Sequence, residues 1–285
     1  MQQGPAAGNP ERPGATQPRA IRLASDDVRA FPVPPAGFAD RQPGIAQGLV
    51  KEFEYDSAVT GKRRKASVYL PPAYSALRRY PVLYLLHGLA GTHDEWPAYV
   101  RAAPVLDQLI AAGKAVPMIV VMPNGRALPD DQPAPEERKF SEEHVAGFAN
   151  FERDLLENLV PAIDRNYPTL PGAGQRAIAG LSMGGGQALN FGLGHPEAFS
   201  WVGGFSAAPN TRAATSLLAR PADGPPLRLL YLSCGKQDGL IGVSQDFHQA
   251  LRRLGVPHIW HVDDYGHERE SWAEALYQFA QLVFR

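Results

Sequence analysis

One short motif in this chain has the residue types and spacing of a nucleophilic serine site. Gly180-Leu181-Ser182-Met183-Gly184 matches the pattern G-x-S-x-G. It lies between a stretch predicted to be a strand and a predicted helix, which is the context of a nucleophile elbow. There a sharp turn exposes the serine Oγ above the sheet, and the flanking glycines allow close packing. Ser182 is therefore the candidate nucleophile. The alternative is a glycine-rich helix start without chemistry.

A serine hydroxyl needs a base within hydrogen-bonding reach, and that base needs an acid to orient it. Proteins with this elbow carry the three residues in the order serine, acid, histidine. His267 follows a predicted strand, and Gly266 before it permits a tight turn toward the sheet edge. Four other histidines follow Ser182 but lie on a helix, within a strand or before a proline: His195, His248, His258 and His261. We expect His267 to be the general base.

The candidate acid is Asp238, in the loop after a predicted strand. Loops at the carboxyl ends of parallel strands meet at one sheet edge, where an acid can reach a neighbouring histidine. Asp263 and Asp264 are rivals, but they lie so close to His267 in sequence that their carboxylates are badly placed to support it. The alternative for Asp238 is a plain surface-loop residue.

Attack on an ester also creates an oxyanion, which two backbone N–H groups can stabilise. One donor is expected from Met183, the residue after the nucleophile. The other is expected from the loop His87-Gly88-Leu89-Ala90-Gly91, which follows an apolar run. Leu89 N–H is the candidate, and we expect His87 to brace the loop by hydrogen bonding.

The elements that must position these residues follow from hydrophobic periodicity. Continuous apolar runs, as at residues 81–86 and 118–122, are typical of strands buried on both faces. Strands are predicted at residues 49–56, 65–70, 81–86, 118–122, 176–179, 199–205, 227–233 and 258–262. Helices are predicted at residues 99–112, 151–167, 183–193, 245–254 and 271–283. This alternation predicts an α/β domain over residues 46–285, with a mostly parallel sheet covered by helices on both faces.

Two segments depart from the alternation. Residues 1–45 begin with a stretch rich in Gly, Pro, Ala and Gln, predicted to be a disordered leader, and continue with a Pro-rich extended segment at 31–44. The leader has no apolar core of a signal peptide. Residues 126–147 are polar and contain several prolines. They are expected to form either a lid over the strand ends or a plain solvated loop.

Composition excludes several classes of protein. The 285 residues are 44% hydrophobic, enough for a sizeable core, and 28 basic against 29 acidic residues disfavour a nucleic-acid binder. No apolar run approaches the roughly 20 residues needed to cross a bilayer, which excludes an integral membrane protein. The single cysteine, Cys234, excludes an intrachain disulfide and is expected to be a buried structural thiol. No P-loop, dinucleotide fingerprint or metal-ligand spacing is present, so no cofactor or metal is expected.

Several motifs together resemble the esterase D-like branch of the α/β-hydrolases and, within it, bacterial feruloyl and acetyl-xylan esterases of carbohydrate esterase family 1. The resemblance covers residues 49–285, and residues 31–38 are similar to the lead-in of secreted members. The motifs are Tyr84-Leu85-Leu86-His87-Gly88, Asp94-Glu95-Trp96, residues 177–186 (AIAGLSMGGG), residues 206–210 (SAAPN), Cys234-Gly235 ahead of Asp238, and Gly266-His267.

The resemblance implies an α/β-hydrolase fold and the same triad of Ser182, Asp238 and His267. It also implies that Asn124 and Trp272 lie near the acyl pocket, where the alternatives are a turn residue and a core aromatic. The implied protein is a secreted or periplasmic serine esterase that cleaves feruloyl or acetyl esters of plant xylan. The chain departs from the family's pattern at residues 126–139 and 268–271, where substrate would be held.

Alternative functions remain open at this point. Within enzymes they are an acetyl-xylan esterase, an S-formylglutathione hydrolase, a siderophore esterase or an acyltransferase. Outside enzymes, the alternative is a carbohydrate-binding or adhesion module that keeps the fold without turnover. The sequence makes no prediction of oligomeric state.

Overall fold

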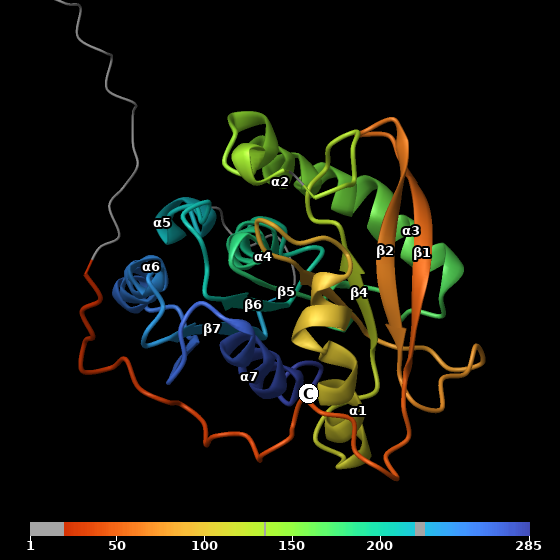
Figure 1. Ribbon diagram of the computed structural model, residues 1–285, viewed down its shortest axis with the longest axis horizontal. Coiled ribbons are helices and arrows are strands. Elements are labelled where there is room, and N and C mark those ends of the chain that lie inside the picture. The colour runs from red at the N-terminus through yellow and green to blue at the C-terminus, as the bar shows by residue number, and fades with distance from the viewer. Residues whose placement is uncertain (1–19, 134, 220–225) are drawn as a thin grey trace, which may run out of the picture.

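Eight strands form a single sheet in the order β1-β2-β4-β3-β5-β6-β7-β8 (Figure 1). The computed structural model describes residues 20–133, 135–219 and 226–285, so most of the predicted leader lies outside the described residues. The strands are β1 (Leu49–Ser57), β2 (Lys62–Leu70), β3 (Val82–Leu86), β4 (Ile119–Pro123), β5 (Arg176–Leu181), β6 (Trp201–Phe205), β7 (Leu229–Gly235) and β8 (Ile259–Asp263). β2 is antiparallel to β1 and β4, and the other neighbours are parallel.

Helices cover both faces of this sheet. They are η1 (Glu95–Val100), α1 (Ala102–Ala111), η2 (Glu136–Arg138), α2 (Glu142–Asp154), η3 (Leu155–Leu159), α3 (Val160–Asn166), η4 (Ala173–Gln175), α4 (Met183–Gly194), α5 (Ala214–Leu217), α6 (Ile241–Leu254) and α7 (Arg269–Ala280). α1 and α7 lie on one face, and α3, α4 and α6 lie on the other (Figure 1).

The central strands explain why both faces must be covered. Along β3, Leu83 and Leu85 face the α1–α7 core, whereas Tyr84 and Leu86 face the α4 core. Successive side chains of a strand point to opposite faces, so a continuous apolar run requires a helix layer on each side. The predicted α/β architecture is confirmed, and all eight predicted strands are present.

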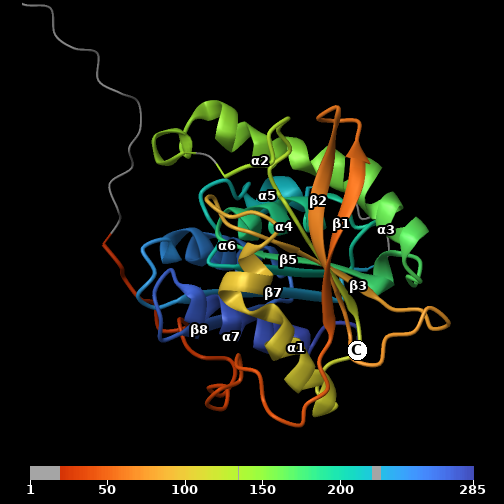
Figure 2. The same ribbon diagram turned by 45° about the vertical axis from the view of Figure 1, so that its right-hand side comes forward.

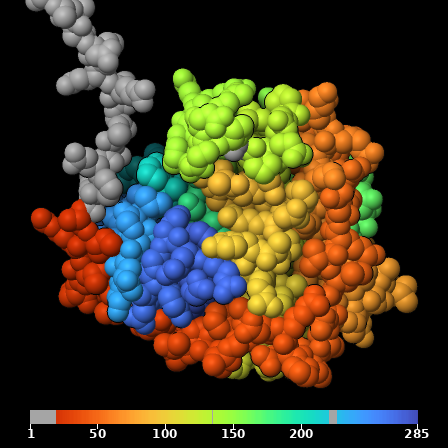
Figure 3. Space-filling view, viewed as in Figure 1, coloured from red at the N-terminus to blue at the C-terminus, as the bar shows by residue number. Residues whose placement is uncertain are grey.

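The segment at residues 126–147 differs from a plain loop. α2 begins at Glu142, nine residues before the helix predicted at 151, and Ser141 caps it by accepting a hydrogen bond from His144 N–H at 3.3 Å. The helical periodicity was weak here because the first two turns of α2 bury little apolar surface. In Figure 3 this lime-coloured segment lies above the yellow residues of the loop after β3 and of η1.

The chain before β1 runs along the surface of the domain. Figure 2 shows it in orange, passing below α7 and α1. The Gln278 amide donates a hydrogen bond to Pro32 O at 2.9 Å, and the Gln108 amide donates to Phe38 O at 2.8 Å. Residues 31–44 thus lie along the domain, but they are not extended throughout: turns are closed by hydrogen bonds from Phe38 N–H to Pro35 O at 3.2 Å and from Asp40 N–H to Gly37 O at 2.9 Å. No helix in the described ranges has the length and apolar character to cross a lipid bilayer.

Candidate active site

Ser182 occupies a strained turn between β5 and α4. Its backbone has φ 53° and ψ −118°, in the positive-φ region that residues other than glycine rarely adopt. The turn is held by a hydrogen bond from Ser182 N–H to Phe205 O at 2.9 Å and one from Ala208 N–H to Ser182 O at 3.1 Å. A side chain at Gly180 would place its Cβ 2.4 Å from Gly184 O, so strand and helix can pack this closely only with glycine there.

The three predicted side chains form one hydrogen-bonded series. His267 Nε2 lies 3.0 Å from Ser182 Oγ, and His267 Nδ1 lies 2.8 Å from Asp238 Oδ2. Because an ionised carboxylate only accepts hydrogen bonds, Nδ1 carries the proton and Nε2 is free to accept the serine proton. This is the tautomer that a general base for Ser182 requires.

Asp238 is fully buried at the carboxyl end of the sheet, after β7. Its second oxygen, Oδ1, accepts a hydrogen bond from Leu240 N–H at 2.7 Å. Burial opposes ionisation, but the hydrogen bonds from His267 and Leu240 outweigh it and lower the pKa of Asp238. The carboxylate is therefore charged at neutral pH and can stabilise an imidazolium at His267.

The backbone around Leu89 is fixed by His87. Gly125 N–H donates to His87 Nε2 at 2.7 Å, so Nδ1 carries the proton and donates to Gly88 O at 2.6 Å. The C=O and N–H of a trans peptide point in opposite directions, so this contact sets the direction of Leu89 N–H. Burial lowers the pKa of His87 to about 4, which keeps the ring neutral.

Met183 is the first residue of α4, so its N–H has no acceptor within the helix. A helix N-terminus also carries a partial positive charge that favours an anion. Met183 follows the serine directly, and the loop that carries Leu89 also approaches it, since a Cβ at Gly88 would lie 3.5 Å from Ser182 Cβ.

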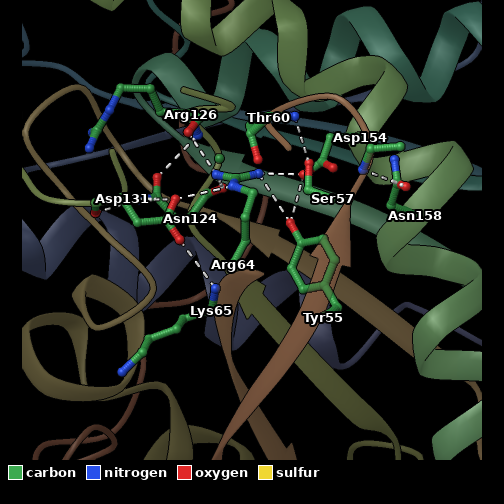
Figure 4. Close-up of polar contacts among 12 residues, drawn as sticks. Tyr55, Ser57, Thr60, Arg64, Lys65, Asn124, Arg126, Asp131, Asp154 and Asn158 are labelled. Carbon is green, nitrogen blue, oxygen red and sulfur yellow. Dashed lines mark hydrogen bonds and ion pairs between the residues drawn. The ribbon is translucent and has the colours of Figure 1, made fainter. Parts of the chain in front are cut away.

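The two residues implied only by resemblance occupy different places. The Trp272 ring lies 5.1 Å from the His267 ring in an edge-to-face arrangement, so it borders the site. Asn124 is fully buried and lies in the polar cluster around Arg64 (Figure 4). Its Nδ2 donates to Asp131 O at 2.8 Å and its Oδ1 accepts from Arg126 N–H at 3.1 Å. The Asn124 amide therefore links the chain at Asp131 to the backbone at Arg126, next to the Gly125 N–H that contacts His87.

An apolar cluster beside the serine includes a residue that sequence reasoning missed. Phe148 on α2 packs with Met183 and Ala208, and Leu89 and Leu240 pack against these three. His144, one turn earlier on α2, contacts Leu89 O through Nε2 at 3.2 Å. Helix α2 therefore lies against the candidate oxyanion loop. The available signal was a pair of aromatic rings four residues apart, at 144 and 148, inside a segment interpreted as lid or loop.

Comparisons with known proteins find similarity to esterases. The family model described as putative esterase matches residues 57–280. An endo-1,4-beta-xylanase/feruloyl esterase of Xylanibacter ruminicola is 33% identical over 247 residues, covering 85% of this chain and 32% of that protein. An esterase of Mycobacterium tuberculosis is 30% identical over 169 residues, covering 58% of this chain and 32% of that protein. The chain thus spans about a third of the length of these curated relatives.

Among solved structures, a CE1 ferulic acid esterase from Anaeromyces mucronatus in complex with ferulic acid superimposes with a TM-score of 0.79. Sequence identity is 27%, and the match covers 88% of this chain and 96% of that chain. The similarity extends over almost the whole of that structure.

Proposed function

We propose that this chain, which belongs to the putative esterase family and has an α/β-hydrolase fold, is a serine carboxylesterase that cleaves feruloyl (hydroxycinnamoyl) esters of plant cell-wall xylan. The observation that carries the proposal is the series Ser182–His267–Asp238, with contacts of 3.0 and 2.8 Å. No metal or organic cofactor takes part in the proposed reaction.

The proposed reaction has two steps. His267 Nε2 takes the proton of Ser182 as Oγ attacks the ester carbonyl, and Asp238 stabilises the imidazolium. The N–H groups of Met183 and Leu89 donate to the oxyanion of the tetrahedral intermediate. His267 then gives its proton to the leaving alcohol, which leaves an acyl ester on Ser182. Water, activated by His267, attacks this ester and releases the acid.

The choice of an aromatic acyl group rests on the apolar cluster. Phe148, Met183 and Ala208 form an apolar cluster with Leu89 and Leu240 packed against it, and two of its members, Met183 and Leu89, are the candidate oxyanion donors. Contact with apolar side chains stabilises a bound aromatic acyl group more than a bound acetyl group, because the aromatic group buries a larger apolar area. The names of the Xylanibacter and Anaeromyces relatives point to the same acyl group.

The setting of the reaction follows from its polymeric substrate. Feruloylated or acetylated xylan, or oligosaccharides cut from it, must reach the enzyme outside the cytoplasm. We therefore place the protein in a secreted or periplasmic location. Residues 46–285 are the proposed esterase domain, and residues 1–45 its leader and surface segment.

The test compares initial rates on methyl ferulate and on 4-nitrophenyl acetate, with Ser182→Ala as the blank. We expect turnover of both by the wild type and a higher kcat/KM for methyl ferulate. Ser182→Ala should lose at least about 10³-fold in kcat because the nucleophile is gone. Circular dichroism of the variant verifies that the fold is retained.

Each other result has a distinct meaning. Turnover of the acetate alone keeps the triad but moves the acyl group to acetyl, or to the small acyl groups of thioester and siderophore esterases. Full activity in purified, folded Ser182→Ala would contradict the assignment of the nucleophile. A wild type that a fluorophosphonate probe does not label would favour a binding module without turnover.

A further inference from the structure

Glu95 makes a contact with the candidate oxyanion loop that the proposed reaction does not yet use. Its Oε2 accepts a hydrogen bond from Gly88 N–H at 2.6 Å. Glu95 is the first residue of η1, and Trp96 beside it anchors this segment through a hydrogen bond from Nε1 to Leu86 O at 2.8 Å. The carboxylate is therefore held in place by a buried indole on the adjacent residue.

With this bond, both polar groups of Gly88 are held. His87 Nδ1–H donates to its carbonyl and Glu95 accepts from its N–H. Gly88 N–H is thus occupied, which leaves the next N–H, that of Leu89, for an oxyanion. The fit is close, because a Cβ at Gly91 would lie 2.5 Å from Glu95 Oε2.

The same carboxylate lies near the reacting groups. A Cβ at Gly88 would be 3.5 Å from Glu95 Oε2 and 3.5 Å from Ser182 Cβ, so the two residues flank one glycine. Ser182 Oγ in turn is 3.0 Å from His267 Nε2. Glu95 and His267 also interact electrostatically, so the negative charge of Glu95 attracts an imidazolium at His267.

We propose that Glu95 is a positioning residue with two roles: it orients the oxyanion loop through Gly88, and its charge supports the imidazolium that His267 forms during the reaction. This inference rests on the proposed function, since it needs Ser182 and His267 to react. Glu95 would thus be a second carboxylate near the nucleophile, in addition to Asp238.

Several other titratable groups lie near this site, among them Glu268, which accepts from Gly266 N–H at 2.9 Å, and His144, which contacts Leu89 O at 3.2 Å. Burial raises the pKa of Glu95, whereas the Gly88 N–H bond and the charge of His267 oppose that rise. His87 is neutral, and Arg269 at the start of α7 pairs with Glu270 on its own helix at 2.9 Å. Asp238 faces His267 from the loop after β7, and the Trp272 ring carries no charge. His93 lies near Asp94 and Glu52 at the exposed side of the loop.

The experiment measures the rate at which a fluorophosphonate probe labels Ser182 as a function of pH. The rate rises as His267 loses its proton, so the midpoint of the acid limb reports that ionisation. Glu95→Gln removes the charge but keeps an oxygen that can accept from Gly88 N–H. We expect its midpoint to move to lower pH by about half a unit, because the imidazolium loses a favourable neighbour.

Two further variants separate charge from position. Asp94→Asn makes the same charge change one residue away, at an exposed carboxylate, and should leave the midpoint unchanged. Glu95→Asp keeps the charge but falls short of Gly88, so its midpoint should stay near that of the wild type. Its plateau labelling rate should fall about threefold or more, because the loop loses its anchor.

The outcomes are distinguishable. A Glu95→Gln midpoint equal to or above that of the wild type, or an equal shift in Asp94→Asn, overturns the electrostatic role. An unchanged plateau rate in Glu95→Asp overturns the positioning role. A wild type that is not labelled at all overturns the proposed function itself, and this inference with it.

Discussion

A single protonation state, that of His87, orders the candidate oxyanion loop, residues 87–91. The ring accepts from Gly125 N–H at Nε2 and donates to Gly88 O from Nδ1. A second proton on Nε2 would face the Gly125 N–H and break this arrangement. Burial accordingly lowers the pKa of His87 to about 4, against an ordinary value near 6.5. The loop is thus built around a histidine that must stay neutral.

This neutrality makes stability depend on pH. The folded pKa lies below the unfolded one, so the unfolded chain binds the proton first as pH falls. The contribution of neutral His87 to the free energy of unfolding should therefore be complete above pH 6.5. As the pH falls from 6.5 to 4, the free energy of unfolding should decrease by about 3 kcal/mol. Urea unfolding of the wild type and of His87→Gln across this range checks the expectation. Parallel pH dependences in the two proteins would contradict it.

At the residue scale, chain order was sufficient to select the three side chains of the candidate triad, which the structure places in contact. Ser182, Asp238 and His267 each follow a predicted strand, and parallel strands bring such loops to one edge. Phe148 and Glu95 could not be placed in the same way, because neither follows a strand end. Their positions depend on how α2 and η1 fold back over the sheet, which local periodicity does not encode.

At the scale of elements, a buried polar cluster joins parts of the chain that periodicity treats as separate. Arg64 on β2 pairs with Asp154, the last residue of α2, and with Asp131 at 3.1 Å (Figure 4). It also donates to Asn124 O at 2.8 Å and to Arg126 O at 2.7 Å. One guanidinium therefore ties the β1–β2 hairpin to α2 and to the loop behind His87.

Removing this guanidinium should be costly. Arg64→Met leaves Asp154 fully buried without its cation, so the unfolding free energy should fall by about 3–5 kcal/mol. Arg63→Met is the matched control: the neighbouring side chain is 67% exposed, and its ion pairs should be worth less than about 1 kcal/mol. Urea unfolding at pH 7 measures both. Similar small losses would show that Asp154 is stabilised by other groups.

This cluster also shows which parts of the fold could not be placed from the sequence. The strands could be placed within about three residues because apolar runs and glycine turns bound them. The structure of residues 126–147 could not be predicted, because these residues pack around Arg64. In the sequence KRRKASVYL of β2, Arg64 resembles any solvent-exposed charge, although it is fully buried. Its burial depends on acceptors some 60 to 90 positions away.

At the scale of the whole molecule, the segment before β1 is joined to α7 by an ion pair whose acidic partner is buried. Arg29 Nη1 contacts Glu274 Oε1 at 2.5 Å, and Glu274 is fully buried on α7. His261 on β8 completes the contact: it accepts from Ala30 N–H at 3.0 Å and donates to Glu274 at 3.1 Å. The surface segment is thus joined to the core of the domain.

Cutting this link should destabilise the whole domain. Arg29→Met leaves the buried Glu274 carboxylate without its cation. The free energy of unfolding should fall by about 3 kcal/mol, which lowers Tm by several degrees. Adding Glu274→Gln to Arg29→Met should recover most of the loss, because no unpaired charge then remains. Arg41→Met, at an exposed position of the same segment, is the control. A Tm for Arg29→Met equal to that of the control would mean that the segment is held elsewhere.

The crowded turn around Ser182 has an evolutionary consequence. A Cβ at Gly180 would meet Gly184 O at 2.4 Å, and one at Gly184 would meet His87 O at 2.5 Å. Packing requires these two glycines, whereas the serine between them is required only by the proposed reaction. A descendant that lost its serine and its turnover would still need both glycines to fold. A distant homologue that keeps the glycine spacing is therefore expected to share the fold. Only a serine at the position of Ser182 would indicate that it also keeps the proposed catalysis.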